Sequence, residues 1–376
     1  MGSTFFSDAI VIGAGPAGLG TALGLAREGV DVIVLDKQDR IGSVRRGETV
    51  RFDKEMDDIL GGGFFEKQSI RKICKGTYFS HTGTSHVDRV IRNPNNIISW
   101  PDFIQGLADV VSASGARIWP ASNVVDLIER DGGIRGVRAT VSGHMEEELT
   151  CRAVFSCGGF DDPASRMLGI DRSKIDLPVT KQLVKGYKAL DDRLEYHFHV
   201  GEGVLAVCAV FPRGNEEAEI ILMSLPKDGK PARLSFERFS EEHPLFRKRI
   251  RGSESVYTLN TMIPMGGMIF PVCRKPGLVM AGDALGHVQA RGGSGIRTSF
   301  LIGYAAGRLG AQAIRAGEWT GETVSIYERH IRKSPHVRSL RLHNFVYSTL
   351  RSKIFGRIGS PEEMDGHWHI LQHALR

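Results

Sequence analysis

Apolar and polar positions follow two different patterns along the chain. Residues 8–35 hold two apolar runs on either side of an alanine- and glycine-rich stretch, which predicts a strand, a turn, a helix and a second strand. A similar pattern returns at residues 278–314, where "LVMAGD" precedes a glycine-rich turn and a helical stretch. Between about Lys181 and Pro271, short runs such as "LEYHFHV", "VLAVCAVF" and "AEIILMSL" alternate with turns. That second pattern is typical of an antiparallel sheet.

The remaining segments complete the prediction. Residues 101–120 predict a helix and a strand, residues 123–141 a hairpin that turns at Asp131, and residues 149–159 a strand that ends in glycines. The last fifty residues are expected to be helical. We therefore expect an α/β (α+β) fold, with a doubly wound Rossmann-type domain, an inserted antiparallel-sheet domain and C-terminal helices. The expected segments are 1–60, 97–178 and 270–325 for the nucleotide-binding domain, 61–96 and 179–269 for the substrate domain, and 326–376 for the helical end.

Composition narrows the class of protein. The 376 residues are 41% hydrophobic, enough for a large core, and no continuous apolar stretch reaches the roughly 18 residues of a membrane span. The five cysteines are scattered without CxxC or other metal-ligand spacing, so we expect reduced thiols, no metal site and a cytoplasmic location.

Positive charge gathers near the C-terminus. Residues 327–357 carry eight Lys or Arg against one acid, Glu328, in a chain with a net charge of +6. An anionic lipid surface, an acidic protein partner and a merely solvated helix all remain open. Nucleic acid is disfavoured, because no recognition motif or aromatic platform accompanies the charge. Peripheral attachment to a membrane therefore stays an option.

The first glycine-rich turn has the spacing G-x-G-x-x-G. Gly13 allows the tight turn, Gly15 lets a pyrophosphate approach the backbone, and Gly18 permits close helix–strand packing. Asp36 ends the second strand, where an acid accepts hydrogen bonds from a ribose diol. The turn predicts NAD or FAD and disfavours NADP. The cofactor residues expected here are Gly13, Gly15, Pro16, Ala17, Gly18, Asp36 and Lys37.

The second turn separates NAD from FAD. One βαβ half is enough to bind NAD. FAD carries a ribitol and an isoalloxazine ring, so it is longer and needs a second turn. Gly282 lets the backbone lie against the ribitol, and Asp283 can accept from its hydroxyl groups. The helix that opens at "GGSG" directs its amides at the flavin N1–C2=O edge, where negative charge gathers on reduction. FAD is therefore the expected cofactor, with Gly282, Asp283, Gly293, Ser294, Gly295 and Ile296 among its ligands.

These two segments resemble the large FAD family of aromatic hydroxylases, geranylgeranyl reductases and electron-transferring-flavoprotein dehydrogenases. The likeness implies the p-hydroxybenzoate hydroxylase-like fold. "IGSVRRGETV" (41–50) is similar to the reductases' G-x-V-R-C-G-E segment, and "AVFPRGNEEAEI" (209–220) to the end of their Y-x-W-x-F-P-K-G strand. The basic tail is more similar to the flavoprotein dehydrogenases. The resemblance adds Arg45, Arg46, Gly47, Val124 and Gly158 to the expected FAD contacts.

Four departures limit what the resemblance implies. Arg46 replaces the reductase cysteine, and Val207 and Ala209 replace the Tyr and Trp that wall an isoprenoid cavity. The hydroxylases' D-G motif is absent, with Cys157-Gly158-Gly159 in its place and two acids, residues 161 and 162, further on. Trp100 stands where many relatives have Arg. No second G-x-G-x-x-G exists, so we expect a transient electron donor, either NAD(P)H or a reduced ferredoxin-like protein.

Three residues are candidates for catalysis. Arg291 precedes "GGSG" and could stabilise an anionic flavin or an acidic substrate group. His287 has the titration range of a proton donor, although a packing or hydrogen-bonding role is favoured. Arg46 could contact the ring or the pyrophosphate. His197 and His199 share one face of a strand, but no third ligand is available for a metal site.

The expected activity is that of an FAD-dependent oxidoreductase. The preferred reaction is reduction or dehydrogenation of a carbon–carbon bond in an apolar, lipid-like substrate, as in the geranylgeranyl reductases. Two alternatives stay open. One is a flavin monooxygenase that uses NAD(P)H and oxygen, and the other is an electron-transfer flavoprotein that links a protein partner to a quinone.

Overall fold

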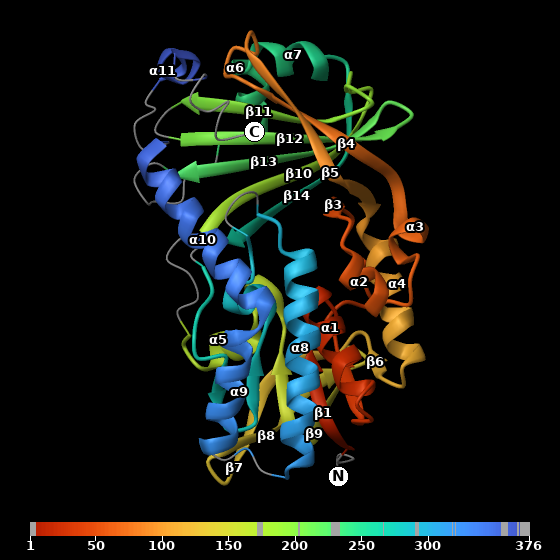
Figure 1. Cartoon of the computed structure of the whole chain (residues 1–376). Helices are drawn as coiled ribbons and strands as arrows, with labels where there is room; N and C mark the ends of the chain where they lie inside the picture. Colours follow the sequence, from red (N-terminus) through yellow and green to blue (C-terminus); the bar gives the residue numbers. More distant parts are fainter. Residues whose placement is uncertain are drawn as a thin grey trace. The chain divides into compact units, whose positions relative to one another are not determined.

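The chain forms two compact units. The computed structural model describes residues 5–170, 176–201, 204–226, 234–265, 267–289, 293–317, 319, 321–354, 360–366 and 368. Unit 1 comprises Met1–Val44, Pro101–Lys174 and Pro264–Val346, and unit 2 comprises Arg45–Trp100, Ile175–Ile263 and Tyr347–Arg376. Figure 1 follows both units along the chain. No helix among the described residues is both long and apolar enough to cross a membrane.

Unit 1 is built on a mainly parallel sheet. Its strands are β1 (Phe5–Ile12), β2 (Val32–Leu35), β6 (Arg117–Trp119), β7 (Asn123–Arg130), β8 (Gly133–Val141), β9 (Met145–Ser156), β15 (Cys273–Lys275) and β16 (Leu278–Met280). They run in the order β15-β16-β9-β1-β2-β6, with β7 and β8 added beside β9. The neighbours β16–β9, β9–β1, β1–β2 and β2–β6 are parallel. The doubly wound fold expected from the sequence is confirmed.

Unit 1 also contains helices, the last of which continues into unit 2. They are α1 (Pro16–Ala26), α4 (Trp100–Ala113), α5 (Pro163–Met167), α8 (Ile296–Arg315), α9 (Gly321–Lys333) and α10 (Pro335–Ile354), with short 3-10 turns η1 (Gly159–Asp161) and η2 (Gly282–Leu285). The central strands read as continuous apolar runs because both of their faces are covered. Ile10, Ile33 and Val154, for example, are each at most 1% exposed.

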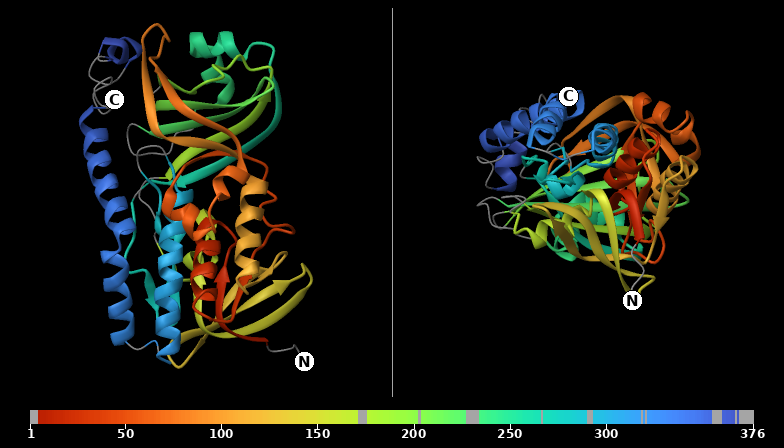
Figure 2. Two further views of the ribbon diagram at one scale, coloured as in Figure 1. Left: turned by 45° about the vertical axis from the view of Figure 1, so that its right-hand side comes forward. Right: turned by 90° about the horizontal axis from the view of Figure 1, so that it is seen from below.

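Helices α1 and α8 lie side by side in unit 1 (Figures 1 and 2) and touch through glycines. A Cβ on Gly303 would lie 2.3 Å from the Ala17 carbonyl oxygen, and one on Gly307 would lie 2.1 Å from that of Thr21. Gly20 and Gly24 make the reciprocal approach to α8, at 2.4 Å from two of its carbonyl oxygens. These distances leave no space for a side chain, so backbone meets backbone.

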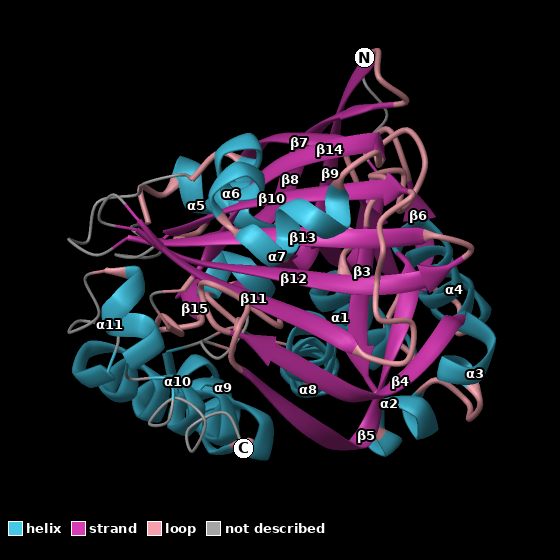
Figure 3. Ribbon diagram, turned by 90° about the horizontal axis from the view of Figure 1, so that it is seen from above, coloured by secondary structure: helices cyan, strands magenta, loops and turns pink. Residues whose placement is uncertain are grey.

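Unit 2 is an eight-stranded sheet, in which β11 and β4 are parallel. Its strands are β3 (Gly47–Arg51), β4 (Ser69–Phe79), β5 (His86–Ser99), β10 (Asp176–Lys185), β11 (Leu194–Gly201), β12 (Val204–Gly214), β13 (Glu217–Pro226) and β14 (Glu254–Pro264), in the order β14-β10-β13-β12-β11-β4-β5-β3. Its helices are α2 (Lys54–Ile59), α3 (Phe64–Gln68), α6 (Phe236–Glu242), α7 (Pro244–Ile250) and α11 (Pro361–Gly366). Figure 3 separates strands from helices by colour. The expected antiparallel-sheet domain is thus present.

Residues 45–60 lie in a different place from the one expected. Their sequence pattern predicts that they belong to the nucleotide-binding segments, whereas they pack in unit 2. The physical reason is strand pairing, because β3 is hydrogen-bonded to β5 over residues 47–51. This pairing joins residues about fifty positions apart, which no local pattern encodes.

The unit 2 sheet has two unlike faces. Side chains of Ala206, Cys208 and Val210 face α6 and α7 and pack with their Phe residues. The opposite side, which we call the aromatic face, consists of Tyr78, Tyr196, Phe198, Val207, Ala209, Ile221 and Met223. Strand register places Lys181 beside Ile221 on this same face. The aromatic face is therefore apolar with a cation in it.

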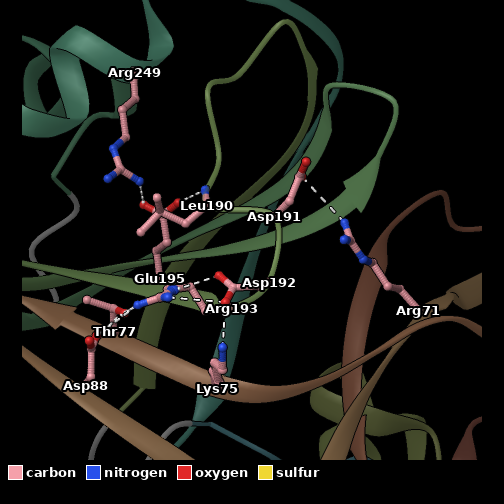
Figure 4. Close-up of polar contacts among 10 residues, drawn as sticks. All are labelled: Arg71, Lys75, Thr77, Asp88, Leu190, Asp191, Asp192, Arg193, Glu195 and Arg249. Atoms are coloured by element: carbon pink, nitrogen blue, oxygen red, sulfur yellow. Dashed lines mark hydrogen bonds and ion pairs between the residues drawn. The ribbon is translucent and has the colours of Figure 1, made fainter.

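A buried carboxylate anchors α7 to the other face. Glu195 is fully buried, receives a hydrogen bond from the Leu190 amide at 2.7 Å and forms an ion pair with Arg249 (Figure 4). His197 Nε2 lies 3.0 Å from the same carboxylate. The exposed pairs in the same view, such as Lys75 with Asp192, contribute little because water screens them.

Candidate nucleotide site

The first glycine turn lies at the carboxyl end of β1. Gly13 has φ +94°, and a Cβ there would lie 2.6 Å from the Cys157 carbonyl oxygen. A Cβ on Gly18 would lie 1.8 Å from the Gly13 oxygen. A Cβ on Gly15, by contrast, would meet no atom within 4 Å. Gly13 and Gly18 are required by packing, and Gly15 borders open space.

The amino end of α1 carries no side-chain cap. Gly15 is its N-cap, and Pro16 occupies the first turn. Amide groups at an uncapped helix start attract anions, helped by the helix dipole. This end of α1 therefore suits a diphosphate.

Asp36 closes the same turn. Its two carboxylate oxygens accept hydrogen bonds from the Ala14 amide at 2.7 Å and the Gln38 amide at 2.9 Å. The carboxylate is thus held at the ends of β1 and β2, and it keeps lone pairs for a ribose diol. Lys37, which was expected beside it, is exposed and lies 3.8 Å from Asp161.

The second glycine turn lies directly against the first. Gly282 has φ +78°, and a Cβ there would lie 2.7 Å from the Ala17 Cβ. Gly295 caps α8 without a side-chain hydrogen bond, and its own Cβ would lie 3.5 Å from Asp283 Oδ1. The structure therefore brings both turns and two uncapped helix starts together in unit 1.

His287 is a structural element of the second turn. Its Nδ1 accepts a hydrogen bond from the Gly282 amide at 3.0 Å, and burial lowers its pKa to about 3. The imidazole is neutral at pH 7, so it does not act there as an imidazolium acid. Nε2 carries the remaining proton, is buried and has no hydrogen-bond partner among the described residues. A donor role for that N–H toward the cofactor stays a prediction.

Other expected residues fall in several places. Arg291 lies outside the described residues. Val124 is 4% exposed in the core of unit 1. The Gly293 amide donates a hydrogen bond to the Gln289 carbonyl, and the Ser294 carbonyl accepts one from the Gln289 amide, just before Ile296 begins α8. Their contacts with a cofactor remain predictions.

Asp162 changes how the missing acidic motif is interpreted. In sequence it lies beyond the glycines that follow β9, yet its carboxylate folds back to that strand end. It accepts hydrogen bonds from Ser156 Oγ at 2.7 Å, from the Gly158 amide at 2.9 Å and from the Ser165 amide at 2.8 Å. A buried acid is therefore present at the end of β9. The absent D-G motif does not by itself count against a flavin monooxygenase.

Replacing Asp162 with alanine is expected to weaken FAD binding about tenfold or more. The change leaves the buried Gly158 amide and Ser156 hydroxyl without partners, and it loosens the Cys157 carbonyl against which Gly13 turns. Titration of apoprotein with FAD, followed by fluorescence, measures the effect. Asp161→Ala is the matched control, because Asp161 is exposed and pairs with Arg166. Equal affinities in the two variants would contradict this role.

Arg45, Arg46 and Gly47 belong to unit 2. Arg45 is exposed. The Arg46 guanidinium lies 3.6 Å from the centre of the Trp100 ring, and its Nε is 3.3 Å from Glu48. Two of the departures from the reductase pattern, Arg46 and Trp100, thus contact each other. Glu48 forms a second ion pair with Lys181.

The histidines of β11 belong to a larger buried cluster. His199 lies 4.7 Å from His81 between ring centres, and His197 lies 5.0 Å from His243. Within the part of the chain that the structure describes, no three side chains are arranged to hold a metal ion. Burial lowers the pKa of His243 to about 2 and that of His199 to about 4, and neighbouring histidines add to both shifts. The pKa values of His81 and His197 are also lowered, mainly by burial.

Acid is expected to destabilise the protein through this cluster. Each pKa is lower in the folded state than its unfolded value of about 6.5, so protonation favours unfolding as the pH falls below that value. A histidine that stays neutral to pH 5 reduces the free energy of unfolding by about 2 kcal/mol between pH 6.5 and 5. The charged groups that face the cluster are Glu195, Glu242, Arg238, Arg249, Glu362 and Asp365.

Urea unfolding at pH 7.5 and at pH 5 measures this dependence. His243→Asn removes one titrating ring and retains a side-chain acceptor for the Phe246 amide, which His243 Nδ1 now caps. The difference between the two pH values should shrink in this variant. An unchanged difference would show that His243 does not contribute.

Sequence reasoning missed several of these residues. His81, His243, Glu195, Arg249 and Asp162 come from separate segments, and only the tertiary fold joins them. Asp162 alone had a local signal, because Asp-Pro before a short helical run predicts an N-cap. That signal is present in the structure as the start of α5.

Comparison with known proteins identifies the family. Residues 7–317 match the model of the FAD binding domain family. The digeranylgeranylglycerophospholipid reductase of Methanocaldococcus jannaschii is 25% identical over 374 residues, which cover 98% of this chain and 91% of the relative. Its counterpart, reductase 2 from Methanococcoides burtonii, is 26% identical over 340 residues, covering 85% of this chain and 79% of the relative.

Solved structures share the fold. A geranylgeranyl bacteriochlorophyll reductase-like protein from Thermoplasma acidophilum superposes with a TM-score of 0.85 at 18% identity, over 98% of this chain and 92% of that one. A myxobacterial chondrochloren halogenase, described as FAD-dependent, gives a TM-score of 0.73 at 15% identity, over 93% and 82% of the two chains.

The geometry of unit 1 fits FAD. This unit contains two uncapped helix starts, open space at Gly15, and the carboxylates of Asp36 and Asp283. The family match covers the segments that contain both glycine turns. The chain therefore belongs to the FAD binding domain family and is an FAD-dependent oxidoreductase.

Proposed function

We propose that the protein reduces carbon–carbon double bonds of a polyprenyl-type lipid. The similarity to the digeranylgeranylglycerophospholipid reductases spans nearly the whole chain. Reduced FAD would supply a hydride at its N5 position. The protein's own residues would bind the apolar chain and exclude water from the reacting carbons.

The aromatic face of unit 2 carries this proposal. Tyr78 and Tyr196 stack with ring centres 4.7 Å apart and an interplanar angle of 11°, and Phe198 lies 6.5 Å from Tyr78. Val207 and Ala209 pair across the strands with Phe198 and Tyr196. Val207 and Ala209 stand where the reductases have Tyr and Trp. Both thus have an aromatic ring beside them on the neighbouring strand. Such a face offers an isoprenoid chain apolar and aromatic contact area.

The test is anaerobic turnover of the FAD-loaded protein. A digeranylgeranyl glycerophospholipid is supplied with NADH, NADPH, dithionite or reduced ferredoxin, and mass spectrometry follows the gain of two hydrogen atoms per reduced bond. Saturation of the chains supports the proposal. Rapid oxygen uptake with NAD(P)H, without saturated product, would instead assign a monooxygenase.

We further propose that the electron donor docks transiently. The sequence contains one G-x-G-x-x-G and no second one for a resident nicotinamide. NAD(P)H and a reduced ferredoxin-like protein are the two candidate donors, and the donor panel of the turnover assay distinguishes them.

We also propose a cytoplasmic protein that contacts the membrane surface through α10. Leu342 and Phe345 are 64% and 70% exposed, and Arg338 and Arg341 lie on the same side at helical spacing. Exposed apolar residues beside cations suit an anionic lipid surface. All five cysteines are free thiols, which agrees with a reducing compartment. Sedimentation with phosphatidylserine vesicles, weakened in a Leu342→Ser/Phe345→Ser variant, tests the contact.

A further inference from the structure

A buried ion cluster borders the aromatic face of unit 2. It contains three cations and two anions: Arg46, Lys181, Arg213, Glu48 and Glu219. Lys181 is 5% exposed and Glu219 is fully buried, and strand register places both on the aromatic face. The cluster therefore has a net charge of +1 next to an apolar surface.

Most of these charges are already satisfied by one another. Lys181 forms a short ion pair with Glu48. Glu219 accepts from Arg213 at 2.7 Å and from the Tyr257 hydroxyl at 2.7 and 2.8 Å. The excess positive charge belongs to Arg46, whose only ion pair among the described residues is the 3.3 Å approach of Nε to Glu48.

The position of Arg46 leaves its terminal amino groups available. The guanidinium carbon lies over the Trp100 ring, 3.6 Å from its centre, so the ring covers one side of the group. No hydrogen bond of the two terminal nitrogens is found in the described part of the chain, and the side chain is 23% exposed. A stacked guanidinium with a free edge binds carboxylate or phosphate groups through two parallel hydrogen bonds.

We propose that Arg46 binds the anionic headgroup of an amphiphilic lipid whose apolar chain lies on the aromatic face. The identity of that chain rests on the proposed function, whereas the headgroup site rests on the ion cluster alone. Glu48 and Lys181 act as positioning residues, because Glu48 lies 3.3 Å from Arg46 Nε and Lys181 forms an ion pair with Glu48 in turn, which leaves the terminal nitrogens of Arg46 for the ligand. The ligand class is a phosphate monoester or diester attached to a long isoprenoid or related chain.

The test compares two probes that differ only in the headgroup. Oxidised, FAD-loaded protein is titrated with geranylgeranyl monophosphate and with geranylgeraniol, and the flavin absorbance and tryptophan fluorescence report binding. Arg46→Gln should raise the Kd of the phosphate about tenfold or more. The Kd of the alcohol should stay within about twofold. Arg46→Lys should restore part of the affinity, since it keeps the charge but loses the fork.

Arg51→Gln is the matched control. Arg51 is an exposed arginine at the far end of β3, the strand that begins directly after Arg46, so its replacement removes the same charge without touching the cluster. It should leave both Kd values unchanged. An equal loss of phosphate affinity in the Arg51 and Arg46 variants would overturn the proposal, because it would indicate a general charge effect.

Two further outcomes would also overturn it. One is an equal loss of affinity for the phosphate and the alcohol in Arg46→Gln, which would indicate damage to the fold. The other is competition by inorganic phosphate at the same concentration as the lipid, which would indicate a site for free phosphate. The titration requires no turnover. A protein that prefers the phosphate through Arg46 but reduces no double bond would contradict the proposed function alone.

Discussion

Replacing Gly307 with leucine is expected to force α1 and α8 apart and to release FAD. A Cβ at this position would lie 2.1 Å from the Thr21 carbonyl oxygen, and the obstacle is backbone that cannot rotate away. Overpacking in a core typically costs about 1–3 kcal/mol, and we expect the upper end here. The midpoint of thermal unfolding should fall by about 6–12 °C.

Calorimetry with and without added FAD measures both effects. FAD should raise the unfolding midpoint of the wild type more than that of the variant. Once the helices are separated, the starts of α1 and α8 lie too far apart for one dinucleotide to contact both, so FAD binds more weakly. Gln312→Leu is the control, since it introduces the same side chain at an exposed position of the same helix. A Gly307→Leu protein as stable and as yellow as this control would refute the close backbone contact.

The second large effect is expected from Arg249→Met. The variant leaves the fully buried Glu195 carboxylate without its cation, and breaking a buried pair on one side typically costs about 3–5 kcal/mol. Helix α7 carries Arg249, so its packing on the sheet should be lost first. Urea unfolding, followed by circular dichroism, measures the loss.

A double variant separates the charge from the packing. Glu195→Gln in the Arg249→Met background removes the unpaired charge and keeps an acceptor for the Leu190 amide, so part of the stability should return. Lys75→Met, which breaks only an exposed pair, should change the free energy of unfolding little. If Arg249→Met behaves like Lys75→Met, the buried pair does not stabilise the sheet.

Local patterns predicted the nucleotide-binding half well. Gly13 and Gly18 are specified by close backbone approach, and Gly282 by its positive φ and its contact with the Ala17 Cβ. Such glycines leave a signature at fixed spacing in the sequence. The strands on both sides are apolar because both faces of the sheet are buried. These signals are short-range, so they can be recognised without the fold.

Long-range contacts could not be predicted in this way. Asp162 has its function because the chain turns back to Gly158, and Arg46 meets Trp100 only because β3 pairs with β5. The histidine cluster joins four segments through sheet register and helix packing. In each case the residue type is visible in the sequence, and its partner is not.

The glycine contacts between α1 and α8 have a consequence for how the protein can vary. Since main-chain atoms set the separation of the two helices, substitutions on their outer surfaces leave the spacing between the helix starts unchanged. Unit 1 should therefore tolerate wide surface divergence while accepting a cofactor of one fixed length. Differences in substrate between related proteins would then arise in the sheet of unit 2.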